Sequence, residues 1–414
     1  MAVVKPFKGI RPNPELAEQV AALPYDVMNR EEAKAMAGDN PHSYLHVSRS
    51  EIDLPESVDP YDPIVYQKAN ETFKLMQDQG VLIQDEEPRY YIYRQIMDGR
   101  AQTGIVACAS IDEYVNDTIK KHEFTRPVKE VDRINHFDYC NANTEPVFFA
   151  YRSKAEIQEL IYNWIDNHKP VYDFTTEDDI AHILWVIDDA SVINSIEEMF
   201  KGVDYLYIAD GHHRTASAVK IGLKRREENP GYTGDEEFNY FMTVIFPDEE
   251  LLIMDYNRVV KDLNGNTVEE FLNKVSQSFT IEEVASSEPY KPEDRHIFGM
   301  YLENKWYKLT AKASIINEDD QVERLDVSIL QTNLLNPILG IENPRTDKRI
   351  DFVGGIRGLK ELERRTSTDM KVAFALYPPS MEELFAIADV GEVMPPKSTW
   401  FEPKLRSGLF IHEL

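Results

Sequence analysis

Residues 203–220, VDYLYIADGHHRTASAVK, place an acid, a glycine, two histidines and an arginine between an apolar run and a helical pattern. An aspartate can bind Mg²⁺, a glycine lets the backbone approach a ligand closely, and an arginine grips an anion with two hydrogen bonds. A turn that enters a helix also offers free backbone N–H groups and the positive end of the helix dipole to a phosphate or carboxylate. The pattern predicts an anion site formed by Asp210, Gly211, His212, His213 and Arg214.

The residues on either side of this motif predict a strand followed by a helix. The run 203–208 is apolar and aromatic, as in a buried strand, and residues 215–231 carry apolar side chains at helical spacing before an Asn-Pro-Gly stop. Because Arg214 follows the strand, we expect it to point out of the turn toward a ligand, with Thr215 beside it. Removing the Arg214 side chain is therefore expected to leave folding little changed.

Single residues of this motif have simpler interpretations. One histidine at a helix start usually caps or packs, and Asp210 alone would serve as an N-cap. Five such residues together favour a site. Zinc is the less favoured ligand, because adjacent histidines diverge unless the backbone bends sharply, and no His-Glu-x-x-His segment occurs elsewhere in the chain.

A second stretch, HEFTRPVKEVDR at 122–133, is locally basic in an acidic chain, which suits an anionic substrate or nucleotide. Its basic residues are His122, Arg126, Lys129 and Arg133. By itself, Glu123 fits an exposed acid in a charged loop better than a site residue. Asp132 and Arg133 fit a structural ion pair as well as a site.

Two further segments offer polar groups. In GEVMPPKSTWF, residues 391–401, Lys397, Ser398 and Thr399 follow two prolines and could hold a carboxylate or phosphate, or form a solvated tail. Asp26 in LPYDVMNREE, with two glutamates nearby, fits the N-terminus of a helix as well as a site.

Three of these motifs, in the same order along the chain, resemble those of free serine kinases in the ParB/sulfiredoxin-like superfamily. The motif DGHHR followed by a helix is similar to the kinase signature, the His-Glu pair at 122–123 resembles the segment with the catalytic glutamate, and GEVMPPKST resembles the kinase C-terminal segment. A large bacterial and archaeal family of unknown function matches nearly end to end, through LPYDVM, HEFTRPVKEVDR, ADGHHR and MPPKSTWFEPKL.

The kinase resemblance implies transfer of a phosphoryl group from ATP or ADP to the hydroxyl of free L-serine, with Mg²⁺. It implies catalytic roles for Glu123 as base and for Asp210, His212 and His213, with Asp210 also binding the metal. It implies nucleotide contacts from Gly211, Arg214, Thr215 and Arg133, and serine contacts from His122, Lys397, Ser398, Thr399 and Asp26. The chain contains neither a Walker A loop nor a kinase His-Arg-Asp motif, so the DGHHR turn must hold the phosphates, and it would not discriminate ATP from ADP.

Other functions of the superfamily fit less well. A sulfiredoxin needs a cysteine in the glycine-histidine-arginine loop, whereas Cys108 and Cys140 lie in unrelated segments. A DNA-binding partition protein needs a basic surface, which neither the charge nor the pattern supports. A non-catalytic sensor of nucleotides or amino acids on the same fold stays open as the alternative.

Composition limits the partners and the compartment. With 73 acidic and 45 basic residues the chain has a net charge of -28, which disfavours binding to nucleic acid and to anionic membranes. Two cysteines support neither a disulfide framework nor a cysteine-based zinc site, and no signal peptide or membrane-spanning stretch is evident. We expect a cytoplasmic protein whose partners are small molecules, namely serine and a nucleotide; its oligomeric state is open.

Alternating strand and helix patterns predict an α/β (α+β) fold with mixed sheets and a ParB/sulfiredoxin-like core. Asp98-Gly99 predicts a hairpin turn, and residues 238–246 and 251–260 are expected to be paired strands. We expect three segments: an N-terminal α/β segment at 1–88, the core with the HE and DGHHR motifs at 89–250, and a C-terminal α/β region at 251–414. The tail of the last region, 391–404, is expected to return to the site.

Overall fold

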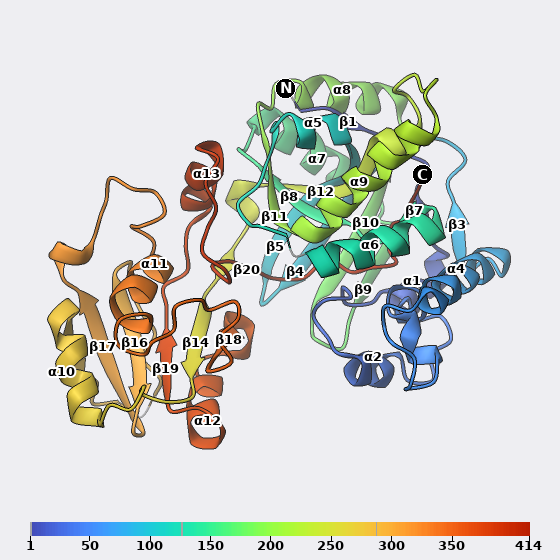
Figure 1. Cartoon of the computed structure of the whole chain (residues 1–414). Helices are drawn as coiled ribbons and strands as arrows, with labels where there is room; N and C mark the ends of the chain where they lie inside the picture. The colour runs from blue at the N-terminus through green and yellow to red at the C-terminus, as the bar shows by residue number, and fades with distance from the viewer. Residues whose placement is uncertain (1, 126, 287) are drawn as a thin grey trace. The chain divides into compact units, whose positions relative to one another are not determined.

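The computed structural model describes residues 2–125, 127–286 and 288–414, and it has the predicted α/β fold with a large mixed sheet (Figure 1). The chain forms two compact units. Unit 1 comprises residues 1–251 and 403–414, and unit 2 comprises residues 252–402. Unit 2 is therefore an insertion in the sequence of unit 1, and the three-segment division expected from the sequence stays a prediction.

A nine-stranded mixed sheet forms the centre of unit 1. Its order is β6-β11-β8-β12-β5-β4-β10-β9, and β1 pairs with β5 off this path. The pairs β11–β6 and β12–β8 are parallel and the others are antiparallel. The strands are β1 (Val4–Lys5), β4 (Tyr90–Met97), β5 (Arg100–Ser110), β6 (Ile119–Lys120), β8 (Val147–Tyr151), β9 (Tyr172–Thr175), β10 (Ala181–Ile187), β11 (Leu206–Asp210) and β12 (Tyr240–Pro247).

The hairpin predicted at Asp98-Gly99 is confirmed. Strands β4 and β5 pair with Met97 opposite Arg100, and both turn residues have positive φ, 52° for Asp98 and 77° for Gly99. Such a two-residue turn matches the right-handed twist of the strands that it joins. The same β5 pairs with β12 on its other side, so this hairpin lies inside the large sheet.

Helices pack their apolar faces on this sheet. The core of unit 1 joins strand residues such as Ile105 and Phe149 to Ile161 and Trp164 of α7 (Ala155–Asn167) and to Phe200 of α8 (Ala190–Phe200). The other helices that contribute to this core are α5 (Ile111–Val115), α6 (Pro127–Cys140) and α9 (His212–Glu228).

The N-terminal segment of unit 1 has a core of its own. It contains α1 (Ala17–Val20), α2 (Arg30–Ala37), α3 (Leu45–Ser48) and α4 (Pro63–Asp78), with β2 (Ile10–Pro12) paired to β3 (Leu82–Gln84). Phe73 and Met76 of α4 pack in one cluster with Cys140 at the end of α6 and with Ile411 from the last residues of the chain. The C-terminal residues thus complete this core, and β21 (His412–Glu413) pairs with β7 (Ala142–Asn143).

Unit 2 is built on a six-stranded antiparallel sheet with the order β15-β17-β16-β19-β14-β18. Its strands are β14 (Tyr256–Val260), β15 (Phe279–Glu283), β16 (Ile297–Leu302), β17 (Lys305–Ala311), β18 (Ile350–Gly354) and β19 (Val372–Ala375), and β13 (Ile253–Met254) pairs separately with β20 (Trp400–Phe401). Its helices include α10 (Val268–Ser278), α11 (Asp326–Leu330), α12 (Lys360–Thr368) and α13 (Met381–Asp389).

One pairing predicted from the sequence is wrong. Strands β12 and β14, expected to form a hairpin, lie in different sheets: β12 pairs with β5 and β8 in unit 1, and β14 pairs with β18 and β19 in unit 2. The short connection suggested a hairpin, but the chain passes there from one unit into the other.

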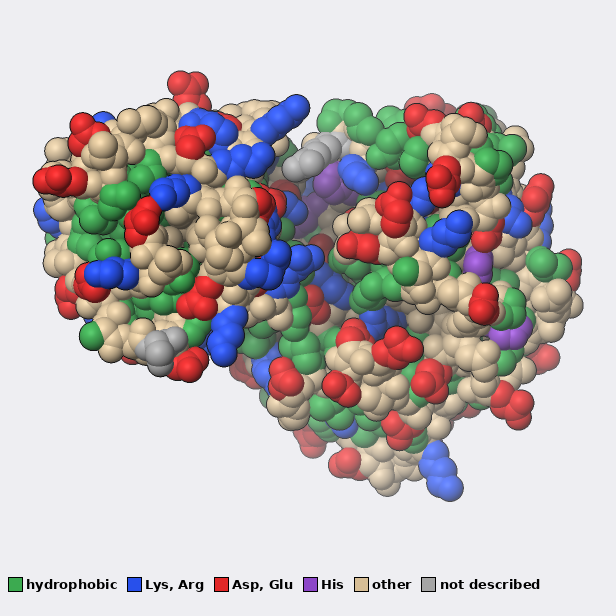
Figure 2. Space-filling view, turned by 90° about the horizontal axis from the view of Figure 1, so that it is seen from below, with side chains coloured by type: hydrophobic (Ala, Val, Ile, Leu, Met, Phe, Trp, Pro, Cys, Tyr) green, Lys and Arg blue, Asp and Glu red, His purple; other side chains and the backbone are tan. Residues whose placement is uncertain are grey.

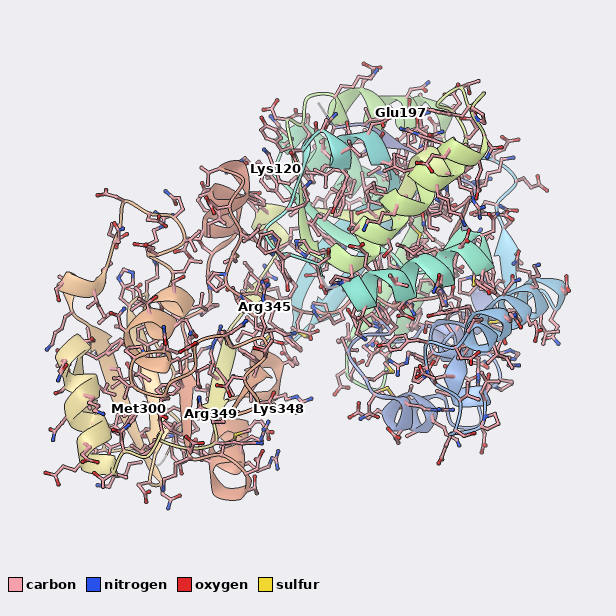
Figure 3. All side chains as sticks on the ribbon, viewed as in Figure 1. Lys120, Glu197, Met300, Arg345, Lys348 and Arg349 are labelled. Carbon is pink, nitrogen blue, oxygen red and sulfur yellow. The ribbon has the colours of Figure 1, made fainter. Side chains whose placement is uncertain are left out.

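Before β18, a stretch of unit 2 is held by one arginine. Figure 3 shows Lys348 and Arg349 near one another and Arg345 farther away. Arg349 donates to the carbonyls of Leu339 and Gly340, at 3.0 and 2.8 Å, and pairs with Asp347 at 2.8 Å. Hydrogen bonds from Arg349 thus help to close this loop, and Leu339 and Ile341 within it are fully buried.

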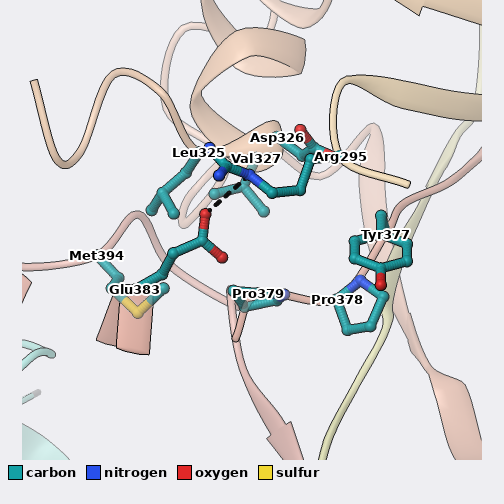
Figure 4. A pocket seen from close by; sticks show the side chains of 9 residues that line it. All are labelled: Arg295, Leu325, Asp326, Val327, Tyr377, Pro378, Pro379, Glu383 and Met394. Atoms are coloured by element: carbon teal, nitrogen blue, oxygen red, sulfur yellow. Dashed lines mark ion pairs between the residues drawn. The ribbon is translucent and has the colours of Figure 1, made fainter. Parts of the chain in front are cut away.

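Unit 2 also contains a pocket of about 280 Å³ (Figure 4). Apolar side chains, including Leu325 and Met394, form much of its wall, and Arg295 pairs with Glu383 at 3.1 Å. Asp326 accepts a hydrogen bond from the His296 N–H at 2.8 Å through one oxygen, and its other oxygen has no hydrogen-bond partner among the described residues. Burial raises the pKa of Asp326 to about 7.

The acidic composition is distributed over the surface. Asp and Glu side chains are spread over the face of the molecule shown in Figure 2, with Lys and Arg between them. In the part of the chain that the structure describes, every helix is too short or too polar to span a membrane.

Candidate functional site

The predicted anion-binding turn lies at the start of α9, directly after β11. The helix begins at His212, three residues before the predicted start. Gly211 is the N-cap residue with φ 90°, and a Cβ at this position would lie 3.1 Å from the Nε atom of Arg214. Glycine is therefore needed here both for its positive φ and because the arginine packs directly against the turn.

Thr215 closes this turn instead of facing outward. Its backbone N–H donates to the Gly211 carbonyl at 2.9 Å, its hydroxyl donates to the same oxygen at 3.1 Å, and the residue is fully buried. The nucleotide contact implied for Thr215 stays a prediction that would require this hydroxyl to change partners.

Asp210 ends β11 and carries the best-defined charge of the site. One carboxylate oxygen accepts the Gly211 N–H at 2.8 Å, and the other pairs with Lys404 Nζ at 3.0 Å. Burial by itself would raise the pKa of Asp210, but Lys404, Arg214 and the Gly211 N–H lower it overall. The carboxylate is thus ionised and already adjacent to a cation.

The expectation that Arg214 points out of the turn is wrong. The side chain is buried, and Nη1 donates to the carbonyl of Pro146 at 2.5 Å, at the start of β8. Its Nε has no hydrogen-bond partner among the described residues. The residue lies three positions after Gly211, so the first helical turn directs it back beneath the glycine.

Carboxylates surround this buried guanidinium. Burial disfavours the charge of Arg214, yet Asp26, Asp210 and Glu145 raise its pKa overall. Asp26 is exposed, whereas Glu145 is fully buried and accepts hydrogen bonds from Tyr25 N at 3.2 Å and from the Ser407 hydroxyl at 3.0 Å. The sequence-predicted Asp26 is therefore close enough to influence the motif electrostatically.

The two histidine-bearing segments meet in unit 1. The rings of His122 and His212 contact edge to face, with centroids 4.5 Å apart. Burial lowers the pKa of His122 to about 4, and burial together with the neighbouring His122 lowers the pKa of His212 well below its usual value. Both rings are neutral at pH 7, and His212 Nε2 is buried without a hydrogen-bond partner among the described residues.

Glu123 lies at the edge of this histidine pair. Its carboxylate is 3.9 Å from His212 Nδ1, and its side chain is 41% exposed. This exposure leaves a glutamate accessible to solvent beside the DGHHR turn. His213 is half-buried, and its charge is one of the influences that lower the pKa of Glu130, after Lys220 and Thr125, against the effect of burial.

Arg133, implied as a nucleotide contact, lies in a buried ion network. It pairs with Asp132 at 3.1 Å, lies 3.5 Å from a Glu145 oxygen, and places its guanidinium 3.9 Å from the centre of the Tyr25 ring. The structural pair that the sequence left open as an alternative is therefore present. Arg126, counted in the same basic stretch, lies outside the described residues.

Lys397, Ser398 and Thr399 belong to unit 2. The Ser398 hydroxyl donates to the Pro395 carbonyl at 2.6 Å and is buried, and Lys397, with φ 61°, places Nζ 5.3 Å from the centre of the Tyr256 ring. The Lys397 carbonyl accepts from Arg258 at 3.0 Å. These bonds explain the local shape of the segment, and the serine contacts implied for its side chains stay predictions.

Sequence reasoning missed Lys404 and Glu145 as members of the site. Lys404 stood at the end of the quoted motif MPPKSTWFEPKL, and its pairing with Asp210 spans 194 residues. Glu145 follows the run Asn-Ala-Asn-Thr and directly precedes Pro146 and the apolar run 147–150, so the local sequence does not mark it as buried.

The residues available for a metal ion are few. Within the described residues no group of three or more His, Cys, Asp or Glu side chains could hold one. Mg²⁺ often uses only one or two carboxylates and completes its shell with phosphates and water, so Asp210 alone is compatible with it. The Lys404 ammonium would then have to share the carboxylate with the ion.

Comparison with known proteins identifies a family. The family described as "Protein of unknown function (DUF1015)" matches residues 4–328. No curated protein sequence matches the chain.

Solved structures to which the chain is similar include the following three. A conserved hypothetical protein from Pyrococcus furiosus is 17% identical, with 71% of this chain and 91% of that chain covered and a TM-score of 0.34. C-terminally truncated SbnI from Staphylococcus aureus is 10% identical, with 74% and 87% covered and a TM-score of 0.39. A free serine kinase in complex with AMP is 15% identical, with 71% and 89% covered and a TM-score of 0.33.

Proposed function

The chain belongs to the family described as protein of unknown function (DUF1015), and from its own site we propose that it is a small-molecule kinase. It transfers a phosphoryl group from ATP or ADP to the hydroxyl of free L-serine, giving O-phosphoserine. The observation that carries the proposal is the meeting of three distant segments in unit 1: Glu123 beside His212, Asp210 at the start of α9, and Lys404 on Asp210.

The charges around this point suit phosphoryl transfer, which depends on positioning and neutralisation more than on covalent chemistry. The α9 N-terminus and Lys404 offer positive potential to a phosphate, and Glu123 offers a carboxylate at the accessible side of the turn. Two of these segments, the DGHHR turn and the His-Glu pair, are motifs that resemble those of free serine kinases, which supports serine as the acceptor.

In the proposed reaction the serine Oγ attacks the terminal phosphorus of the nucleotide. Glu123 accepts the hydroxyl proton as the new P–O bond forms, and the bond to the bridging oxygen breaks to release ADP from ATP, or AMP from ADP. Mg²⁺, held by Asp210, would neutralise the charge on the phosphates.

The other residues of the site act by positioning. The neutral His212 ring lies between His122 and Glu123, so it can orient the glutamate or donate to a phosphoryl oxygen. Buried Arg214 connects the turn to the start of β8 and balances Asp26, Asp210 and Glu145. We assign it to the support of Asp210 rather than to direct contact with the donor.

The test is a direct assay of the full chain with Mg²⁺, ATP or ADP, and a panel of free amino acids. Phosphorus NMR and mass spectrometry of the products should find O-phosphoserine with stoichiometric loss of the terminal phosphate. Nucleotide binding without transfer to any amino acid would instead establish the sensor function. Absence of both would reject the site.

A further inference from the structure

Unit 1 contains a second pocket that the proposed kinase chemistry does not use. It has a volume of about 140 Å³ and lies where the N-terminal segment meets α6. Helices α4 and α6 lie side by side (Figure 1) and both contribute to its wall, and the Tyr66 hydroxyl of α4 donates to Asp132 of α6 at 3.0 Å. Its wall combines three tyrosines with three basic residues, which are Tyr25, Tyr61, Tyr66, Arg49, Lys129 and Arg133.

Among the charged residues that line this pocket, one cation has no ion-pair partner. Glu51 pairs with Arg49 at 2.7 Å, and Asp132 pairs with Arg133 at 3.1 Å. Lys129 makes no hydrogen bond or ion pair with another described residue, and its ammonium lies 5.8 Å from the centre of the Tyr25 ring. A pocket with one unpaired positive charge, in a chain with a net charge of -28, favours a single negative charge in its ligand.

Buried polar atoms at the pocket also lack partners. Ser48 is 2% exposed, and its hydroxyl has no hydrogen-bond partner among the described residues. Nη1 of Arg133 is likewise unpartnered and lies 3.5 Å from a Glu145 oxygen that also lacks a hydrogen bond. Buried hydroxyl and guanidinium groups without partners are costly, and a ligand atom that bonds to them would relieve that cost.

We infer that this pocket binds a small organic acid through its carboxylate, which pairs with Lys129. The Ser48 hydroxyl lies at the wall for a second polar contact, and the Tyr61 and Tyr66 rings cover the apolar part of the ligand. A phosphate dianion fits less well, because it would place two charges against one unpaired cation. The ligand is a free amino acid or a simple monocarboxylate, since both present the same group.

The test is calorimetric titration of the full chain, without nucleotide, with four probes: L-serine, propionate, L-serinamide and inorganic phosphate. We expect saturable binding of a carboxylate and no binding of serinamide, which lacks that group. Lys129→Met should weaken the binding at least tenfold. Lys169→Met, a change at an exposed lysine outside the pocket, should leave it unchanged. Binding of serine but not of propionate would identify the ligand as an amino acid. Binding of both would identify a general carboxylate site.

Two further measurements keep this inference separate from the kinase proposal. Tyr61 is 45% exposed at the pocket, so Tyr61→Ala should fold normally and weaken carboxylate binding. Glu123→Gln should retain carboxylate binding. If no carboxylate binds, if only phosphate binds, or if Lys129→Met binds as well as the unchanged chain, the inference is rejected whatever the kinase assay gives.

Discussion

Glu123 is the residue on which the proposed chemistry depends most directly. A general base contributes typically ~10² to 10⁴ in rate, so Glu123→Gln should lower kcat at least about a hundredfold. The KM for nucleotide should change little, because the carboxylate acts on the acceptor hydroxyl in the transition state. Steady-state assays of serine phosphorylation measure both constants.

The matched control is Glu159→Gln, at an exposed glutamate on α7. It removes the same charge from the chain and should leave kcat unchanged. A large increase in nucleotide KM with kcat preserved in Glu123→Gln would show that Glu123 serves the donor instead.

Arg214 gives a second prediction at this scale. Replacing it with alanine removes a buried cation from among Asp26, Asp210 and Glu145 and leaves the Pro146 carbonyl without its donor. Breaking such a buried arrangement costs about 3 to 5 kcal/mol. Urea unfolding followed by circular dichroism should show that loss, and a variant as stable as the unchanged chain would contradict the buried role.

The residue types of the site were predictable from the sequence, but the directions in which their side chains point were not. The cluster DGHHR after an apolar run identified a turn at a helix start, because that inference needs only local spacing. Arg214 was assigned outward, whereas the phase of the first helical turn directs it inward. The Asp210–Lys404 pair depends on a contact across 194 residues, which no local pattern encodes.

At the scale of elements, the start of α9 depends on Gly211. Alanine at φ 90° is strained by roughly 1 to 3 kcal/mol, and its Cβ would also displace the Arg214 guanidinium. Gly211→Ala should therefore lower stability and weaken nucleotide binding together. Gly231→Ala, where a Cβ meets no atom within 4 Å, is the control for thermal melts and titrations.

Helix α11 carries a prediction about pH. The pKa of Asp326 is about 7 in the folded chain because of burial, against an ordinary value of 3.8. Between about pH 4 and 7 the folded state binds a proton that the unfolded state has lost, so stability falls as the pH rises through this range. The resulting decrease in the free energy of unfolding is at most about 4 kcal/mol.

The stability of Asp326→Asn should therefore depend less on pH than that of the unchanged chain. Compared with the unchanged chain, the variant should be more stable at pH 8 than at pH 5. The amide oxygen can still accept the His296 N–H. Asp319→Asn, at an exposed carboxylate, should keep the original slope in urea unfolding across the same pH range. Equal slopes for all three chains would contradict a buried, protonated Asp326.

Periodicity predicted most elements well, because burial on one face fixes which residues must be apolar. The alternation of strands and helices that it predicted is present, for example in β8 and α7 and in β10 and α8, and the β4–β5 hairpin is confirmed. The pairing of β12 with β14 failed for a different reason. Strand partners are chosen by the whole sheet, and β12 inserts between β5 and β8, whose residues precede it by many positions.

At the scale of the molecule, unit 2 enters and leaves unit 1 at neighbouring points. Glu250 accepts from the Thr103 N–H at 2.5 Å, and the Pro403 carbonyl accepts from Gln102 at 3.4 Å, so both junctions lie next to consecutive residues of β5. A Gly/Ser linker of about six residues, with a root-mean-square span of roughly 13 Å, can therefore replace residues 252–402.

We expect that shortened chain to fold and to melt cooperatively. A matched version that also lacks residues 403–414 loses the buried Leu409, Phe410 and Ile411, and it should be strongly destabilised. Calorimetry and circular dichroism compare the two. Failure of both to fold would mean that unit 1 requires unit 2.

Lys404 also has a consequence for the order in which the site is completed during synthesis. The ribosome adds this lysine only after Glu123, Asp210 and all of unit 2 have been made. Until then Asp210 lacks its pairing cation, and the core of the N-terminal segment lacks Ile411. A nascent chain, or one truncated within unit 2, thus has the whole DGHHR motif without its charge balance. The proposed phosphoryl transfer would therefore begin only once translation has passed Lys404.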